Sequence, residues 1–323
     1  MKGKMKNKGI VFFLIILAAV IVFMMVADYR ADRPGKSKPN PFALDMDDYR
    51  NVDPSLILFK ETKNFRIGFE NPAAMVIHKD RIFVAGDNRI KIIDLNGILL
   101  HEFNTPAGVQ VMNVYEGMIF VAAGNRILVL DDQGNVKGEW GPMEANSLLT
   151  GIALTKSDVF LADAGNRRVL RYSHTGERLG TFDGKADDGV LHGFIVPSPT
   201  FDLAVNNDEE LWVVNPGMHA LENYTFDGKL RGYWKKSGVN PEGFSGCCNP
   251  SYFTFLSDGR FITSEKGLVR VKVYKPSGEL EGVVAAPVKF ADEGKAPGVA
   301  ADSRNNVYLL DFDRKIIRVF EPN

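Results

Sequence analysis

Residues 84–97 (VAGDNRIKIIDLNG), 121–134 (VAAGNRILVLDDQG) and 161–176 (LADAGNRRVLRYSHTG) repeat one pattern. In each copy a short apolar segment leads to an Asn-Arg pair, an alternating apolar segment follows, and a glycine ends the unit. Alternation with a period of two is typical of a half-buried β-strand, and the glycine suits the positive φ of a tight hairpin. The pattern therefore predicts a repeated unit of antiparallel strands.

Three weaker copies follow. They are residues 213–228 (VVNPGMHALENYTFDG), 263–278 (TSEKGLVRVKVYKPSG) and 309–323 (LLDFDRKIIRVFEPN). Successive turn glycines, from Gly97 to Gly278, are roughly 40 to 50 residues apart, which is the length of a four-stranded propeller blade. Six units of this length predict an all-β, six-bladed β-propeller.

The last unit ends directly after its third strand, so it lacks a fourth. Residues 56–67 (LILFKETKNFRI) look like a strand that has no blade of its own. We predict that this N-terminal strand pairs with the strand around Val319 and closes the ring, because closure removes exposed strand edges. The alternative, an open stack of sheets, leaves both ends unpaired.

A single apolar run, residues 9–27 (GIVFFLIILAAVIVFMMVA), precedes the repeats. It is just long enough to cross the hydrocarbon core of about 30 Å as one transmembrane helix. The lysines before it, with no acidic residue among them, favour a cytoplasmic N-terminus. A cleaved signal peptide ending at Ala27 is the alternative, although the run is longer than the usual apolar region of such peptides.

This reading divides the chain into four parts. We expect a cytoplasmic basic tail (1–8), a signal-anchor helix that contacts the membrane (9–27), a polar Pro-containing linker (28–54) and the propeller (55–323). The propeller would then be periplasmic or extracellular. Lys plus Arg number 39 and Asp plus Glu number 40, a formal charge of -1, which leaves no basic excess for a phosphate backbone. Nucleic acid is therefore not expected as a partner.

The repeats resemble the NHL family. The resemblance rests on the order of a short strand, a Val-Ala-Asp-x-x-Asn-x-Arg-Ile-like turn, an apolar third strand and a turn glycine, and it extends from Asn71 to the C-terminus. Residues 213–228 depart most, with Met218 and His219 where other copies have Asn and Arg. The resemblance implies a six-bladed propeller. It implies no single activity, because related propellers include scaffolds, lyases and calcium-dependent hydrolases.

The only two cysteines, Cys247 and Cys248, are adjacent in the loop GFSGCCNP, which we expect at the channel mouth. Adjacent thiols can form a vicinal disulfide, bind a soft metal, or stay reduced as small groups. These three readings remain open at this point.

Four further side chains are candidates for the same face. His192 and His219 lie in predicted loops, and Asp163 and Glu265 follow predicted second strands. With the cysteines they would supply mixed N, O and S ligands for a divalent metal in the propeller channel. The alternative is a local structural role for each, since no His-x-x-x-His or Cys-x-x-Cys spacing occurs.

No nucleophile elbow, phosphate-binding loop or His-Glu-x-x-His motif is present, so a catalytic function has no motif to support it. We therefore expect a binding or scaffolding module that contacts an unknown protein or small molecule through its loop face. A metal-dependent (Ca or Zn) hydrolase or lyase, and a redox accessory protein using Cys247 and Cys248, are the alternatives.

Overall fold

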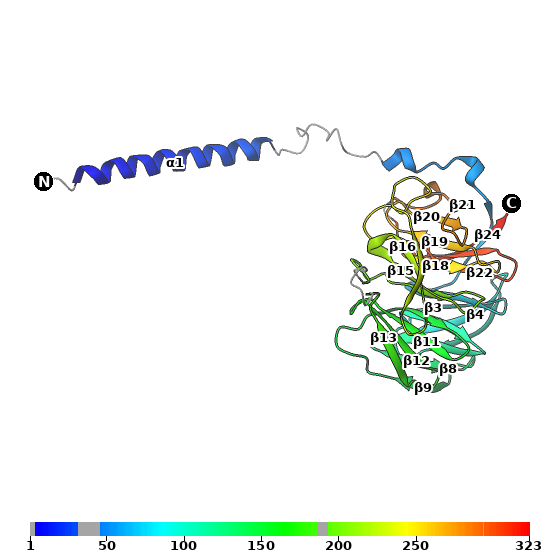
Figure 1. Cartoon of the computed structure of the whole chain (residues 1–323). Helices are drawn as coiled ribbons and strands as arrows, with labels where there is room; N and C mark the ends of the chain where they lie inside the picture. The colour runs from blue at the N-terminus through cyan, green and yellow to red at the C-terminus, as the bar shows by residue number, and fades with distance from the viewer. Residues whose placement is uncertain (1–3, 32–45, 186–192, 293) are drawn as a thin grey trace. The chain divides into compact units, whose positions relative to one another are not determined.

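The computed structural model describes residues 4–31, 46–185, 193–292 and 294–323 (Figure 1). The chain forms two compact units, Met1–Asp45 and Met46–Asn323. In the first, helix α1 (Lys4–Ala31) contains the apolar run, and within it Lys8–Tyr29 has a mean hydropathy of 3.3 and is long enough to cross a membrane. Its large apolar side chains are exposed all round, as in a membrane anchor or a signal sequence.

The second unit is a six-bladed β-propeller, and each blade is a four-stranded antiparallel sheet. The strands of the first three blades are β2 (Pro72–His78), β3 (Arg81–Gly86), β4 (Arg89–Asp94) and β5 (Leu99–Asn104); β6 (Val111–Tyr115), β7 (Met118–Ala123), β8 (Arg126–Leu130) and β9 (Val136–Trp140); and β10 (Leu149–Leu154), β11 (Asp158–Asp163), β12 (Arg168–Ser173) and β13 (Arg178–Phe182). In each blade, strands adjacent in sequence are also adjacent in the sheet.

The strands of the fourth and fifth blades are β14 (Leu203–Val205), β15 (Leu211–Asn215), β16 (Ala220–Tyr224) and β17 (Leu230–Lys235); and β18 (Tyr252–Phe255), β19 (Phe261–Glu265), β20 (Arg270–Tyr274) and β21 (Leu280–Ala285). Short 3-10 helices occupy the connections η1 (Met46–Tyr49), η2 (Pro54–Leu56), η3 (Pro216–Met218) and η4 (Pro287–Lys289).

The sixth blade combines both ends of the propeller unit. It contains β22 (Gly298–Ala301), β23 (Val307–Asp311), β24 (Ile316–Pro322) and, as its fourth strand, β1 (Phe59–Arg66). Lys63 of β1 lies opposite Val319 of β24 in an antiparallel register. The structure thus contains the predicted pairing of the N-terminal segment with the last repeat.

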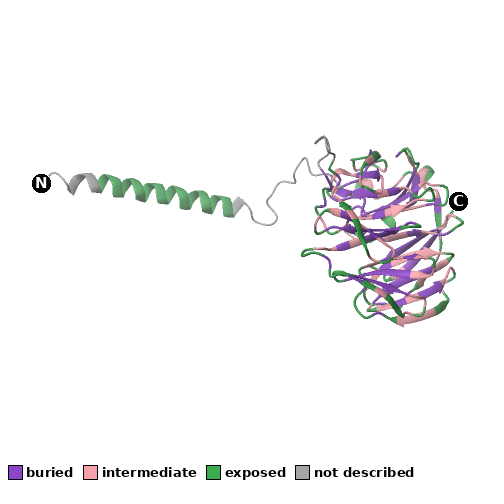
Figure 2. Cartoon of the chain, turned by 60° about the horizontal axis from the view of Figure 1, so that its bottom comes forward, coloured by how far each residue is buried: buried purple, intermediate pink, exposed green. Residues whose placement is uncertain are grey.

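Hydrophobic clusters lie between blades rather than inside them. One cluster joins Ile90 of the first blade to Ile119 of the second, and another joins Val84 of the first to Leu310 of the sixth. Four more clusters join the remaining neighbours. Figure 2 shows buried residues, in purple, along the strands throughout the propeller. A single blade cannot bury both of its faces, so packing around the ring stabilises every blade.

The turn glycines predicted from the repeats contact an aromatic ring of the preceding blade. Gly176 has φ +87°, and a Cβ atom built there would lie 2.6 Å from Nε1 of Trp140 at the end of β9. The same relation holds for Gly97 with Phe65, Gly134 with Phe103, Gly228 with Phe182 and Gly278 with Trp234. A glycine is needed at these turns both for the positive φ and for the close contact.

Candidate functional site

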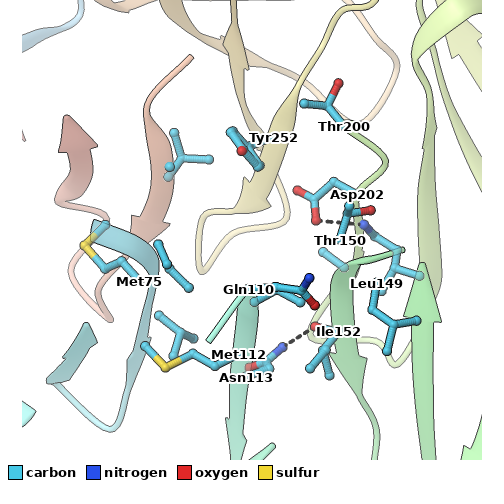
Figure 3. A pocket seen from close by; sticks show the side chains of 18 of the residues that line it. Met75, Gln110, Met112, Asn113, Leu149, Thr150, Ile152, Thr200, Asp202 and Tyr252 are labelled. Carbon is cyan, nitrogen blue, oxygen red and sulfur yellow. Dashed lines mark hydrogen bonds between the residues drawn. The ribbon is translucent and has the colours of Figure 1, made fainter. Parts of the chain in front are cut away.

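A cavity of about 300 Å³ lies on the axis of the propeller, between the first strands of the blades. Its walls combine apolar and polar groups, and the apolar residues include Met75 of β2, Met112 of β6 and Ile152 of β10 (Figure 3). A few polar side chains reach the same space, namely Gln110, Asn113, Thr150, Thr200, Asp202, Tyr252 and Thr254. We call this space the middle cavity.

Two further cavities adjoin the middle cavity. One, of about 410 Å³, shares Thr200, Tyr252 and Phe312 with it and is also lined by Lys266 and Lys295. The other, of about 470 Å³, shares residues such as Asn113 and Thr254 with it and reaches the ends of the first strands, near His78. The three cavities therefore follow one another along the axis.

Asp202, directly before β14, is the one charged side chain among the described residues that line the middle cavity. Its Oδ1 accepts a hydrogen bond from the backbone N–H of Leu203 at 2.9 Å, and its Oδ2 accepts one from that of Phe253 at 3.0 Å. No Lys, Arg or His in the described part of the chain forms an ion pair with it.

The environment of Asp202 disfavours its charge. Asp202 keeps some exposed surface within the cavity, but its withdrawal from bulk water raises its pKa to about 7, and the two backbone hydrogen bonds only partly oppose this rise. The carboxyl group is thus close to half-ionised near neutral pH. A charge that can be gained or lost at this pH, inside a cavity, is typical of functional sites.

Other polar groups of the middle cavity are partly used to join blades. The Thr150 hydroxyl donates to the carbonyl of Phe201 at 2.6 Å, and the Asn113 amide donates to the carbonyl of Ile152 at 2.7 Å. These bonds fix the first strands at the cavity wall. The site is therefore held by inter-blade contacts, which favours a pre-formed rather than a collapsible cavity.

Two aromatic rings meet where the middle cavity joins the cavity of the lysines. The ring centroids of Tyr252 and Phe312 lie 6.4 Å apart at an interplanar angle of 45°. Burial, and secondarily the charge of Asp202, raises the pKa of Tyr252 to about 12. Tyr252 is consequently a neutral phenol at neutral pH, with its ring available as a wall of the site.

Asp163, one of the predicted candidates, lies fully buried at the end of β11. Its Oδ1 accepts from the backbone N–H of Leu148 at 3.0 Å, and its Oδ2 accepts from the Ser147 hydroxyl at 2.9 Å and Nε of Arg168 at 3.1 Å. Asp163 thereby binds the loop that enters its own blade. The side chain is occupied by these contacts and does not line the middle cavity.

Glu265 has an equivalent place in the fifth blade. Its Oε1 lies 2.8 Å from Nε of Arg270 and 2.7 Å from Nζ of Lys272, and all three side chains are buried. Oε2 accepts from the backbone N–H of Ser245, and both cations donate to the carbonyl of Gly243. Burial lowers the pKa of Lys272 to about 7. This cluster holds the loop before β18 against the blade.

His219, Cys247 and Cys248 meet at this same loop. Nε2 of His219 lies 2.7 Å from the carbonyl oxygen of Gly246, and Nδ1 lies 2.8 Å from the Ser237 hydroxyl. Both ring nitrogens are therefore engaged. The structure thus brings Glu265, His219 and the cysteines around one loop, whereas Asp163 belongs to another blade and His192 lies outside the described residues.

The two thiols are free, with their sulfur atoms 2.9 Å apart. Cys247 is exposed and Cys248 is buried. The hydrogen bond with Cys248, followed by the charge of the neighbouring thiolate form, raises the pKa of Cys247, although Lys266 opposes the rise. A raised pKa reduces the thiolate fraction on which nucleophilic and metal-binding reactivity depends.

The candidates do not form a metal-binding group in the part of the chain that the structure describes. Among residues 4–31, 46–185, 193–292 and 294–323, no three His, Cys, Asp or Glu side chains lie close enough together to hold a metal ion. The residues that the sequence missed are those of the middle cavity, above all Asp202.

No family model and no curated protein sequence matches the chain. Solved structures do resemble it. A protein of unknown function from Bacteroides thetaiotaomicron has a TM-score of 0.60 at 13% identity, covering 81% of this chain and 72% of that one. A streptogramin B lyase has a TM-score of 0.55 at 15% identity, covering 84% and 100%.

The WD40 β-propeller domain of Doa1 is similar to the same degree, with a TM-score of 0.55 at 12% identity and coverage of 78% of this chain and 79% of that domain. Of these three proteins, one is named as a lyase, one as a WD40 domain and one as a protein of unknown function. At such identities the likeness shows a shared β-propeller fold and no shared function.

Proposed function

We propose that this chain is an NHL-type repeat propeller that acts as a binding module, with its ligand held in the axial cavities below the loop face. The observation that carries the proposal is the middle cavity of about 300 Å³, whose wall combines apolar and polar groups and holds one carboxyl group, that of Asp202. Small-molecule sites in proteins begin at about this volume, and they use a few polar groups among apolar ones to orient the ligand.

The proposal includes the place of the propeller in the cell. Residues 1–8 form a basic cytoplasmic tail, residues 9–27 anchor the chain in a membrane, residues 28–54 are a linker, and residues 55–323 present the propeller outside the cytoplasm. The support is the length and hydropathy of Lys8–Tyr29 together with the four lysines within residues 1–8.

Binding is favoured over catalysis by the partners of the candidate acids. Asp163 and Glu265 are occupied by hydrogen bonds and ion pairs that fix loops. Asp202 has a pKa suited to proton transfer, but Tyr252, with a pKa of about 12, does not match it near neutral pH. The described residues around the middle cavity therefore offer one acid–base group and no second one.

The membrane orientation can be tested with a single introduced thiol. Lys229 lies exposed in the turn between β16 and β17, so Lys229→Cys is placed in a background with Cys247→Ser and Cys248→Ser. A membrane-impermeant maleimide should label it in intact cells. A matched Lys6→Cys variant should be labelled only after lysis. The reverse pattern would contradict the proposed orientation.

Ligand binding in the cavity can be tested with three ring-matched probes, namely benzylamine, benzyl alcohol and benzoate. The full chain in lipid nanodiscs is titrated with each by calorimetry. At least one probe should bind, and Thr254→Phe, which places a ring in the middle cavity, should abolish that binding. Gln133→Phe, on an exposed turn, should not. If no probe binds, or if both variants behave alike, the cavity is not the binding site.

A further inference from the structure

We propose that the middle cavity binds a small organic cation, with the ammonium group of the ligand paired to Asp202 and its apolar body against Tyr252 and Phe312. This inference rests on the proposed function, and it adds the chemical class of the ligand.

Asp202 lacks a counter-charge among the described residues. Asp202 lines the middle cavity, its partners are two backbone N–H groups, and no cationic side chain in the described ranges pairs with it. A carboxylate withdrawn from water is costly unless a cation accompanies it. A positive group entering the cavity would supply that cation and remove the cost.

The carboxylate oxygens of Asp202 have acceptor sites that no described residue uses. Each oxygen of Asp202 accepts a single hydrogen bond from the backbone, although a carboxylate offers about four lone-pair sites in all. Figure 3 shows the carboxyl group beside the open space that Thr150 and Thr200 also line. The remaining acceptor capacity is therefore available to a donor with several N–H groups, such as a primary ammonium.

The wall of the middle cavity also suits a cation with an apolar body. The rings of Tyr252 and Phe312 lie at the junction of two cavities, and the faces of aromatic rings attract cations. Met75 and Met112 also belong to this wall, but Met112 is only 4% exposed and both side chains pack between blades. An anion of the same shape would instead be repelled by Asp202.

A metal ion fits this cavity less well than an organic cation. Hard divalent cations take six or more oxygen ligands, usually with several carboxylates, whereas Asp202 is the single carboxylate here. Lys266 and Lys295 line only the adjoining cavity, and Lys266 donates to the hydroxyl of Ser198 at 2.8 Å. Because these lysines would repel a cation, the positive group of the ligand should lie in the middle cavity, at Asp202, rather than in the adjoining cavity.

Calorimetric titration of the full chain in lipid nanodiscs at about pH 8 tests the ligand class, because benzylamine is then a cation and Asp202 is ionised. We expect benzylamine to bind at least about tenfold more tightly than benzyl alcohol, and benzoate to bind most weakly. In Asp202→Asn, benzylamine should lose this advantage over benzyl alcohol.

Asp94→Asn is the matched control, since Asp94 also accepts two backbone N–H groups but lies at the end of β4, outside the cavity. It should leave the tenfold preference unchanged. Because Asn at position 202 turns an amide toward a backbone N–H and can destabilise the fold, Tyr252→Leu is the second variant. It should weaken benzylamine more than benzyl alcohol.

The outcomes separate the inference from the function on which it rests. Equal binding of benzylamine and benzyl alcohol to the wild type would overturn the cation assignment while leaving a ligand cavity. An unchanged preference for benzylamine in Asp202→Asn would also overturn the assignment. Absence of binding by all three probes would overturn both the assignment and the proposed binding cavity.

Discussion

The backbone N–H of Phe253 donates a hydrogen bond of 3.0 Å to Oδ2 of Asp202, and this contact joins the fifth blade to the fourth at the channel wall. The bond fixes the carboxyl group at the cavity without neutralising it. Asp202 thus combines a structural contact with a charge that no described side chain balances. The following predictions test this environment and the contacts that build the propeller around it.

Asp202 should make the stability of the protein depend on pH. Its pKa is raised from 3.8 to about 7, so the folded state alone keeps the proton between these values. Stability from this group is complete below about pH 4 and is lost as the pH rises through 7, by at most about 4 kcal/mol. Urea unfolding of wild type and Asp202→Asn across this range should show a difference that falls with pH.

Asp94→Asn gives the control of opposite sign. Backbone hydrogen bonds, chiefly from Ile98, lower the pKa of Asp94, so its contribution is present at neutral pH and lost toward acid. The difference between wild type and this variant should rise with pH. If the difference in free energy of unfolding between wild type and Asp202→Asn does not change with pH, the pKa of Asp202 is not raised in the folded state.

Gly176→Ala should destabilise the propeller more than Gly259→Ala. Both glycines have a positive φ, +87° and +86°, so both substitutions carry backbone strain of about 1 kcal/mol or more. Only at position 176 does the new methyl group meet Trp140, and overpacking of this kind costs about 1 to 3 kcal/mol further. Chemical denaturation gives the free energy of unfolding of both variants. An equal loss of stability in the two would contradict the contact between Gly176 and Trp140.

Glu265→Gln should be strongly destabilising. It leaves Arg270 and Lys272 buried without their anion, and breaking a buried ion pair costs about 3 to 5 kcal/mol. Glu279→Gln, which removes an exposed pair with Lys275, should cost at most about 1 kcal/mol. Comparable losses for the two variants, measured by urea unfolding, would refute a structural role for Glu265.

In the reduced protein, the two cysteines should differ in reactivity. Cys247 is exposed while Cys248 has 2% of its surface exposed, so iodoacetamide should add once to the folded chain. The raised pKa of Cys247 should make even this reaction slow at neutral pH. Mass spectrometry should find no adduct on folded Cys247→Ser; two rapid additions to the wild type would contradict the burial of Cys248.

The sequence predicted the fold because the repeats carry it. The turn glycines, such as Gly176, recur at regular spacing in most blades, so the blades are visible without coordinates. The contact of these glycines with aromatic residues such as Trp140 was found only in the structure. The segment containing β1 was predicted because an incomplete last repeat requires a partner strand. The structure has β1 paired with β24.

The site was harder to predict because function resides in departures from the repeat. Strand registers place Ala74, Val111, Gly151, Tyr252 and Gly298 at positions equivalent to Asp202 in the other blades. A charge at one of six equivalent positions was a signal that the sequence contained. The sequence could not show that this charge lines a cavity, because that requires the first strands of all six blades to be placed around one axis. Asp163 and Glu265 misled for the opposite reason, since carboxylates after second strands recur to hold loops.

The proposed binding of a cation depends on the ionisation of Asp202 in the cavity. The NMR resonance of the Asp202 carboxyl carbon reports this ionisation directly. In the full chain labelled at the aspartate carboxyl carbon, with Asp202→Asn to assign the signal, a pH titration should give a pKa of about 7. Saturating benzylamine should lower that pKa by about one unit or more, because a nearby cation favours the carboxylate. A pKa near 4 without ligand, or no change on adding benzylamine, would contradict the account.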